Sequence, residues 1–241
     1  MASKTETGHA VIVANFQSLI NSVTSMGADY QPSDNALKLP ALTAQHTACK
    51  AANDAVKNPL VAYNDEVSDR ALLFKPLNGL VTQLLAMYNR TKASKQEKSY
   101  AKTIADKIRG EKNKPPKVPG EDTHSTSQRS FVMRTDNFGT FIAILAAEPT
   151  YTPAETNLQV ATLQTMKTNM ESLNNSTDLA AKALKDVRTI RNMALYAEET
   201  GLVDTALAVK EYVKAAFGTK HQHYKNIKGL KFVRIADDPN A

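Results

Sequence analysis

Apolar residues recur every three or four positions along most of the chain, which is the spacing of one buried face of an α-helix. In the first half, this pattern predicts four helices joined by short loops. The first carries an apolar stripe from Val13 to Val23 and precedes a loop at residues 30–33. The second covers residues 36–57, the third begins at Pro59 and the fourth begins at Leu80. Four helices joined by short loops are typical of an antiparallel four-helix bundle.

The second half shows the same pattern. An apolar stripe around Phe138 predicts its first helix, and Thr152–Glu155 has the sequence of a capping box that opens the second. Asn175 is expected to cap the third helix, and the last is predicted over Leu202–Phe217. Only Leu230–Ile235 suits a short extended tail. The chain is therefore predicted to be all-α.

Several short motifs recur in the same order later in the chain, at offsets of 121 or 122 positions. Because the order is preserved and the offset changes by one residue only, we interpret them as an internal duplication. Generic helical spacing is the alternative, but it does not account for the matched motifs. These are Asn15-Phe16 with Asn137-Phe138, Tyr30-x-Pro32 with Tyr151-x-Pro153, and Gly79-Leu80-Val81 with Gly201-Leu202-Val203.

A proline-rich stretch separates the two halves. Residues 111–129 begin with a segment that contains three prolines and end in a polar run. Proline lacks an amide donor and disfavours helix in the residue before it, so this stretch is predicted to be a linker. We therefore expect two tandem, internally duplicated four-helix bundles, over residues 1–110 and 130–241, joined by a Pro-rich linker over 111–129.

Composition supports a packed helical protein. Hydrophobic residues make up 42% of the 241 residues, enough for a core, and 9 glycines and 10 prolines are few for a sandwich or barrel. The single Cys49 cannot form an intramolecular disulfide. The apolar run over residues 10–14 is far shorter than the roughly 20 residues of a membrane span. We expect a cytoplasmic protein without a membrane partner, with leaderless export left open.

Charge is distributed unevenly along the chain. The net charge is +7 over residues 90–118 and +6 over residues 210–234, whereas the whole chain carries +6, so the remainder carries −7. Both basic stretches lie at the same place in the repeat, on the predicted fourth helix and the tail behind it. The sequence therefore predicts two related basic surfaces on an acidic body. The residues expected to bind a partner are Lys95, Lys98, Lys102, Lys107, Lys220, Lys225, Lys228 and Lys231.

Three interpretations of these lysines remain open at the level of sequence. They are a solvated helix face, a surface that docks an acidic protein or another copy of the chain, or a contact with nucleic-acid backbone. In the last case Tyr100, Tyr212 and Tyr224 would stack on bases. Acidic bundles and basic tails are complementary, and head-to-tail contact would give rings or filaments. We expect a non-enzymatic scaffolding protein, with non-specific nucleic-acid binding as the alternative.

Candidate chemistry is sparse. The sequence contains no glycine-rich phosphate loop and no serine nucleophile elbow. His221 and His223 offer two imidazoles, but no nearby cluster supplies further metal ligands. His46 and Cys49 are interpreted as packed side chains and not as a base and nucleophile. We therefore expect no enzymatic activity, no cofactor and no metal site.

Overall fold

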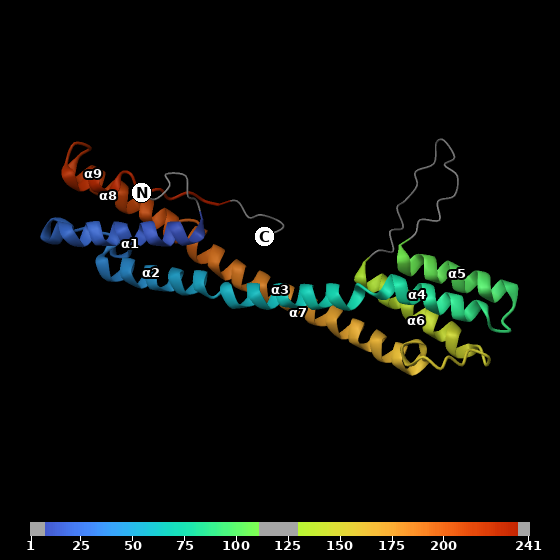
Figure 1. Ribbon diagram of the computed structural model, residues 1–241. Coiled ribbons are helices and arrows are strands. Elements are labelled where there is room, and N and C mark those ends of the chain that lie inside the picture. The colour runs from blue at the N-terminus through green and yellow to red at the C-terminus, as the bar shows by residue number, and fades with distance from the viewer. Residues whose placement is uncertain (1–7, 111–129, 236–241) are drawn as a thin grey trace, which may run out of the picture. The chain divides into compact units, whose positions relative to one another are not determined.

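The computed structural model describes residues 8–110 and 130–235, and these fold as helices joined by loops (Figure 1). The helices of the first half are α1 (His9–Met26), α2 (Leu39–Asp54), α3 (Lys57–Phe74), α4 (Leu77–Asn89) and α5 (Lys95–Arg109). Those of the second half are α6 (Phe131–Ala147), α7 (Val160–Tyr196), α8 (Leu202–Phe217) and α9 (Gln222–Ile227). Short 3₁₀ turns lie at Gly27–Asp29, Asn35–Leu37 and Thr156–Leu158. No strand occurs in these ranges, which confirms the predicted all-α class.

The helices pack into two compact units, each with its own core. Among the described residues, unit 1 comprises 8–61 and 182–235, and unit 2 comprises 62–110 and 130–181. Unit 1 contains α1, α2, α8 and α9, and unit 2 contains α4, α5 and α6. Helices α3 and α7 contribute residues to both units.

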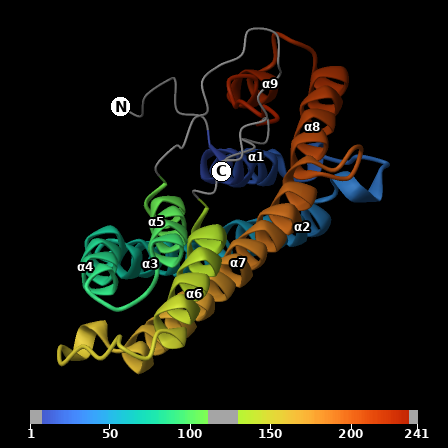
Figure 2. The same ribbon diagram turned by 90° about the vertical axis from the view of Figure 1, so that its right-hand side faces the viewer.

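Each unit combines helices from both halves of the sequence. In unit 1, α8 and α9 from the second half lie against α1 from the first (Figures 1 and 2). In unit 2, α5 from the first half packs against α6 from the second. The predicted tandem four-helix bundles over 1–110 and 130–241 are therefore not confirmed. The predicted linker over 111–129 lies outside the described residues.

The apolar stripes predicted from spacing form the two cores. In unit 1, Phe16 and Leu19 of α1 are fully buried together with Val209 of α8. In unit 2, Phe138 and Phe141 of α6 are likewise fully buried in the core. Burial of one such side chain stabilises the folded state by about 1.5–3 kcal/mol. These residues therefore hold together helices that are distant in the sequence.

The repeated Tyr-x-Pro motif has the same local structure in both halves. The Tyr30 hydroxyl donates to the carbonyl of Leu37 at 2.8 Å, and the Tyr151 hydroxyl donates to the carbonyl of Leu158 at 2.9 Å. Both tyrosines are buried, and burial is the main cause that raises the pKa of each. Each hydrogen bond closes the loop that leads into a long helix.

The two predicted caps in the second half are wrong. Thr152–Glu155 lies in a loop, where Gln159 Nε2 donates to the carbonyls of Pro153 and Ala154, and α7 begins only at Val160. Asn175 lies inside α7 and begins no helix. Residues 160–196 contain neither glycine nor proline, so nothing in this segment interrupts the backbone hydrogen bonds of one continuous helix.

The prediction over Leu202–Phe217 is confirmed, since α8 has these bounds. The basic stretch after α4 differs from the expected tail, because residues 95–109 form helix α5. A capping box begins this helix: Glu97 N donates to Ser94 Oγ at 3.2 Å, and Ser94 N donates to Glu97 Oε2 at 2.7 Å.

Candidate functional site: the α9 lysines and the segment that carries them

The eight lysines predicted to bind a partner fall into two sets on different units. The first set lies on α5 in unit 2 and consists of Lys95, Lys98, Lys102 and Lys107. The second set lies in and around α9 in unit 1 and consists of Lys220, Lys225, Lys228 and Lys231. The structure thus does not gather all eight on one compact unit.

Two lysines of the α5 set are engaged within unit 2. Lys98 Nζ donates to the Thr91 carbonyl at 2.7 Å, and Lys102 Nζ lies 2.7 Å from Asp106 Oδ2. Arg109 binds the other oxygen of Asp106 at 2.5 Å. Burial alone would raise the pKa of Asp106, but the hydrogen bonds from Lys102 and Arg109 outweigh it and the pKa is lowered. This part of the predicted surface therefore serves internal contacts.

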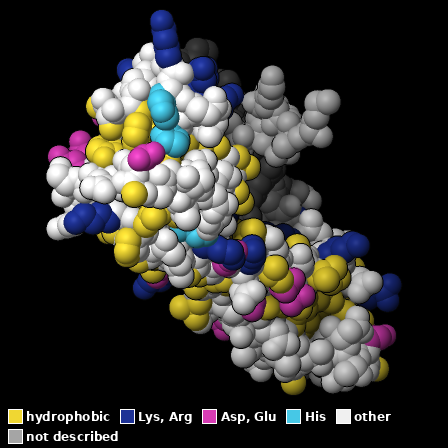
Figure 3. Space-filling model, turned by 90° about the vertical axis from the view of Figure 1, so that its left-hand side faces the viewer, with side chains coloured by type: hydrophobic (Ala, Val, Ile, Leu, Met, Phe, Trp, Pro, Cys, Tyr) yellow, Lys and Arg dark blue, Asp and Glu magenta, His cyan; other side chains and the backbone are white. Residues whose placement is uncertain are grey.

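Three lysines around α9 present their ammonium groups to solvent. Lys220, Lys225 and Lys228 are exposed, and their Nζ atoms form no hydrogen bond or ion pair with any described residue. We call these three residues the α9 lysine set. On the face shown in Figure 3, lysine and arginine side chains stand apart from one another instead of forming a continuous patch.

The backbone that follows α9 is fixed by side chains of α1 and α8. Lys210 Nζ of α8 donates to the carbonyls of Lys228 at 3.1 Å and Leu230 at 3.0 Å. Asn15 Nδ2 of α1 donates to the Lys231 carbonyl at 2.9 Å. Burial lowers the pKa of Lys210. Although Leu230–Ile235 has no regular secondary structure, it is therefore an ordered part of unit 1.

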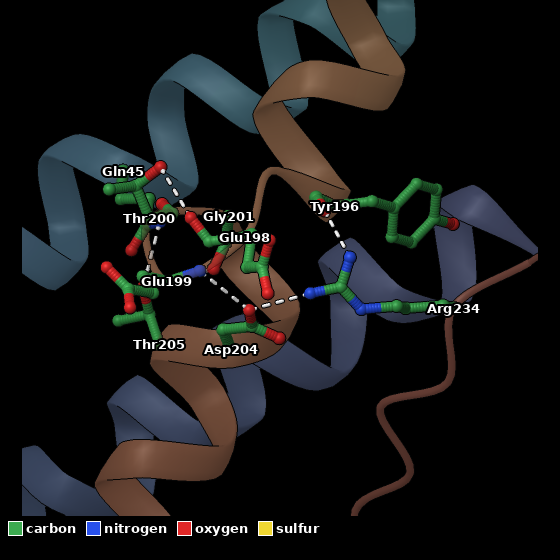
Figure 4. A network of polar contacts seen from close by, with 9 residues as sticks. All are labelled: Gln45, Tyr196, Glu198, Glu199, Thr200, Gly201, Asp204, Thr205 and Arg234. Carbon is green, nitrogen blue, oxygen red and sulfur yellow. Dashed lines mark hydrogen bonds and ion pairs between the residues drawn. The ribbon is translucent and has the colours of Figure 1, made fainter.

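The end of this segment is anchored by one ring and one ion pair. Phe232 is buried and meets Phe16 edge-on, with ring centroids 6.5 Å apart. Arg234 Nη2 lies 2.7 Å from Asp204 Oδ2, and Arg234 Nη1 donates to the Tyr196 carbonyl (Figure 4). The arginine thus joins the tail to the end of α7 and the first turn of α8.

The turn between α7 and α8 is held by further contacts. Glu199 has a positive φ of 63°, and its amide donates to Asp204 Oδ2 at 2.9 Å. Gln45 Nε2 of α2 donates to the Thr200 carbonyl at 2.9 Å and to Thr205 Oγ1 at 3.1 Å (Figure 4). Asp204 therefore receives hydrogen bonds from both the turn and the tail, so the two segments share one anchor.

The two histidines cap and pack α9. His221 Nδ1 accepts from His223 N at 3.2 Å, and both rings contact the Phe217 ring. His223 Nε2 lies 3.7 Å from Asp29 Oδ2. Over residues 8–110 and 130–235, no group of three or more His, Cys, Asp or Glu side chains is arranged to hold a metal ion.

Cys49 and His46 do not form a pair. Cys49 is 1% exposed, and its thiol donates to the Ala194 carbonyl at 3.3 Å. Burial raises the pKa of the thiol to about 11, so it is protonated at neutral pH. The His46 ring stacks on Phe16 with a centroid separation of 6.5 Å. Both side chains have packing roles, as the sequence predicted.

Unit 2 contains a small pocket that the sequence analysis missed. We call it the acidic pocket; its volume is about 160 Å³ and its lining residues are Tyr88, Glu97, Tyr100, Ile144, Ala147 and Glu148. The lining comes from both halves of the sequence, so no local motif signalled it. A wider depression of about 460 Å³ in unit 1 is lined by Tyr30–Pro32 with Lys38 and Leu39, and no carboxylate lines it.

None of the helices in the described ranges combines the length and apolar character that a membrane span requires. No family model matches the chain, and no curated protein or solved structure is significantly similar to it.

Proposed function

We propose that the chain is a non-enzymatic scaffolding protein that docks acidic protein surfaces, foremost those of other copies of itself, through the α9 lysine set. The observation that carries this proposal is that Lys220, Lys225 and Lys228 are exposed cations without a partner among the described residues. Lys228 is the first residue of a segment whose backbone carbonyls accept hydrogen bonds from Lys210 and Asn15, and the other two lysines precede it. A fixed backbone lowers the entropy lost on binding.

The expected contact is weak per residue and sensitive to salt. An exposed ion pair contributes about 0–1 kcal/mol, so several lysines have to act together. Screening shortens the range of such contacts, and the Debye length falls from about 10 Å at 0.1 M salt to about 3 Å at 1 M.

We propose further that the chain arose by duplication of one helical module. The matched hydrogen bonds of Tyr30 and Tyr151 and the matched burial of Phe16 and Phe138 support this history. Under this proposal the two modules exchanged helices, because α8 and α9 complete unit 1 while α4 and α5 complete unit 2.

Nucleic-acid binding by the same lysines is supported less well. Of the three tyrosines predicted to stack on bases, Tyr212 packs edge-on against Tyr30, with ring centroids 5.3 Å apart, and its hydroxyl accepts from Gln31 N. Tyr224 is half-buried against the core of unit 1, and only Tyr100 is exposed. The stacking platform that single strands require is therefore not assembled around the α9 lysine set.

Binding to labelled polyglutamate and to random-sequence DNA and RNA, measured by fluorescence anisotropy, tests the proposal. The informative variant replaces Lys220, Lys225 and Lys228 with Gln. Its matched control replaces the exposed Lys75, Lys182 and Lys185, which also lack side-chain partners among the described residues. We expect salt-sensitive binding of polyglutamate that the first variant loses and the control keeps.

Two outcomes would overturn the proposal. One is equal binding of polyglutamate by the wild type and by the α9 variant. The other is a preference for DNA or RNA over polyglutamate that depends on the same three lysines, which would establish the alternative function.

A further inference from the structure

The acidic pocket lies where three elements of unit 2 meet. Tyr88 belongs to the last turn of α4, Glu97 and Tyr100 to the first turns of α5, and Ala147 to the last turn of α6. Its volume of about 160 Å³ exceeds the roughly 30 Å³ that a water molecule occupies in the liquid. It is below the roughly 300–1,000 Å³ of pockets for drug-sized ligands. The space therefore suits one side chain or a small ligand.

Both carboxylates in the pocket lack a cationic partner. Glu97 Oε2 accepts from the Ser94 amide at 2.7 Å, and Glu148 Oε1 accepts from the Thr150 amide at 3.0 Å. The Thr150 hydroxyl also donates to Glu148. No lysine, arginine or histidine of the described chain forms an ion pair with either group. Two carboxylates thus line one small site without a cationic side-chain partner among the described residues.

Tyr88 supplies the third polar group of the pocket. The residue is 2% exposed and lines the pocket, and its hydroxyl forms no hydrogen bond with any described residue. The hydroxyl is not among the buried side-chain atoms that lack a hydrogen-bond partner, so it reaches the open space of the pocket. Burial and then the charges of Glu97 and Glu148 raise the pKa of this hydroxyl. It is therefore neutral at physiological pH and keeps an oxygen lone pair for a donor that enters the pocket.

The rest of the pocket lining suits a ligand that carries a cationic group on an alkyl chain. The C-terminal end of α6 carries the partial negative charge of the helix dipole, and its last turn contains no basic residue. Ile144 and Ala147 are apolar, and the exposed ring of Tyr100 can pack on methylene groups or on a cation.

The geometry points to a binding site for an alkylammonium group in the acidic pocket, formed by Glu97, Glu148 and the Tyr88 hydroxyl. A primary ammonium has three donors, which matches these three acceptors, and its alkyl stem would lie on Ile144 and Tyr100. The group comes either from a free amine or from a lysine side chain of another copy of the chain. The second source rests on the proposed function, whereas the first does not.

Titration of the full-length chain with N-acetyl-lysine methylamide, followed by two-dimensional NMR, tests the site directly. The matched probe is N-acetyl-norleucine methylamide, which has a similar stem and no charge. We expect saturable shifts around Tyr88 and Glu148 with the lysine probe only. Glu97→Gln and Glu148→Gln should each weaken binding at least tenfold, and Tyr88→Phe should weaken it severalfold.

The variants are chosen to preserve the fold. Gln at position 97 can still complete the capping box with Ser94, and Gln at position 148 still offers an acceptor to Thr150. Glu198→Gln, an exposed site in unit 1, changes the net charge equally and should leave binding unchanged. Absence of binding to the wild type, or equal binding by the Glu97→Gln/Glu148→Gln double variant, would overturn the inference.

The two sources of the ammonium are separated by measuring self-association of the same double variant by light scattering. If lysines of another copy occupy the pocket, this variant should lose self-association although its lysines are intact, and free lysine probe should compete in the wild type. Probe binding without any effect on self-association assigns the site to free amines. In that case the amine-binding site is confirmed and only its role in docking another copy of the chain is overturned.

Discussion

Arg234 and Asp204 form an ion pair at 2.7 Å that ties the last described residues of the chain to the first turn of α8. The carboxylate also accepts from the Glu199 amide, so one side chain fixes both the tail and the turn before α8. This relationship explains how a segment without regular secondary structure holds a constant place beside the α9 lysine set.

Breaking this pair should loosen the tail. Arg234 and Asp204 are partly exposed, so we expect Arg234→Ala to cost only about 0.5–1 kcal/mol of unfolding free energy. Asp204→Asn should cost a similar amount, and the double variant should cost less than the sum because the two residues interact. Urea unfolding followed by circular dichroism measures all three. Strict additivity would contradict a direct contact.

The two matched tyrosines should contribute equally to stability. Tyr30→Phe and Tyr151→Phe each remove a buried hydrogen bond to a carbonyl and leave its acceptor unsatisfied. The expected loss is about 1–2 kcal/mol for each variant in urea unfolding. A clear loss at one position and none at the other would show that the Tyr-x-Pro motifs are not structural equivalents.

The paired motif glycines should respond to alanine with opposite signs. A Cβ at Gly201 would lie 2.6 Å from the backbone nitrogen and oxygen of Ala197, so Gly201→Ala should cost about 1–3 kcal/mol. A Cβ at Gly79 meets no atom within 4 Å, and the residue lies within α4. Gly79→Ala should therefore stabilise by about 0.5–1 kcal/mol. Thermal melting of both variants checks this, and loss of stability at both positions would contradict it.

The Asp106 ion pairs should make unit 2 sensitive to acid. Because the pKa of Asp106 is lowered in the folded state, its contribution to stability is present above its unfolded pKa of about 3.9 and is lost as the pH falls through the folded value. The stability difference between wild type and Asp106→Asn should thus shrink as the pH falls below the unfolded pKa of about 3.9. A difference that stays constant or grows on acidification would contradict this assignment.

Local features of the fold could be predicted from the sequence. The limits of α8 follow from Gly201 and Gly218 on either side of an apolar stripe, and these are the limits in the structure. The repeated tyrosine loops were also visible as a motif. Conversely, the continuous α7 was divided at Asn175, because a residue that favours helix caps was given more weight than the lack of any helix breaker.

Non-local pairing could not be predicted in the same way. Phe16 meets Phe232 at the other end of the chain, and helical periodicity states which face is buried without stating against which helix. The acidic pocket has the same origin, because Glu97 and Glu148 come from different halves of the sequence. The α9 lysine set was predicted from local charge, but the engagement of Lys98 and Lys102 in internal contacts was not.

The most direct test of the account is the mass of the full-length chain in solution, measured by light scattering over a range of protein concentrations at low and high salt. We predict a mass above that of the 26.3 kDa monomer that rises with concentration at low salt and falls toward the monomer at high salt. A monomeric mass at every concentration and salt, or an assembly that salt does not affect, would contradict docking through the α9 lysine set.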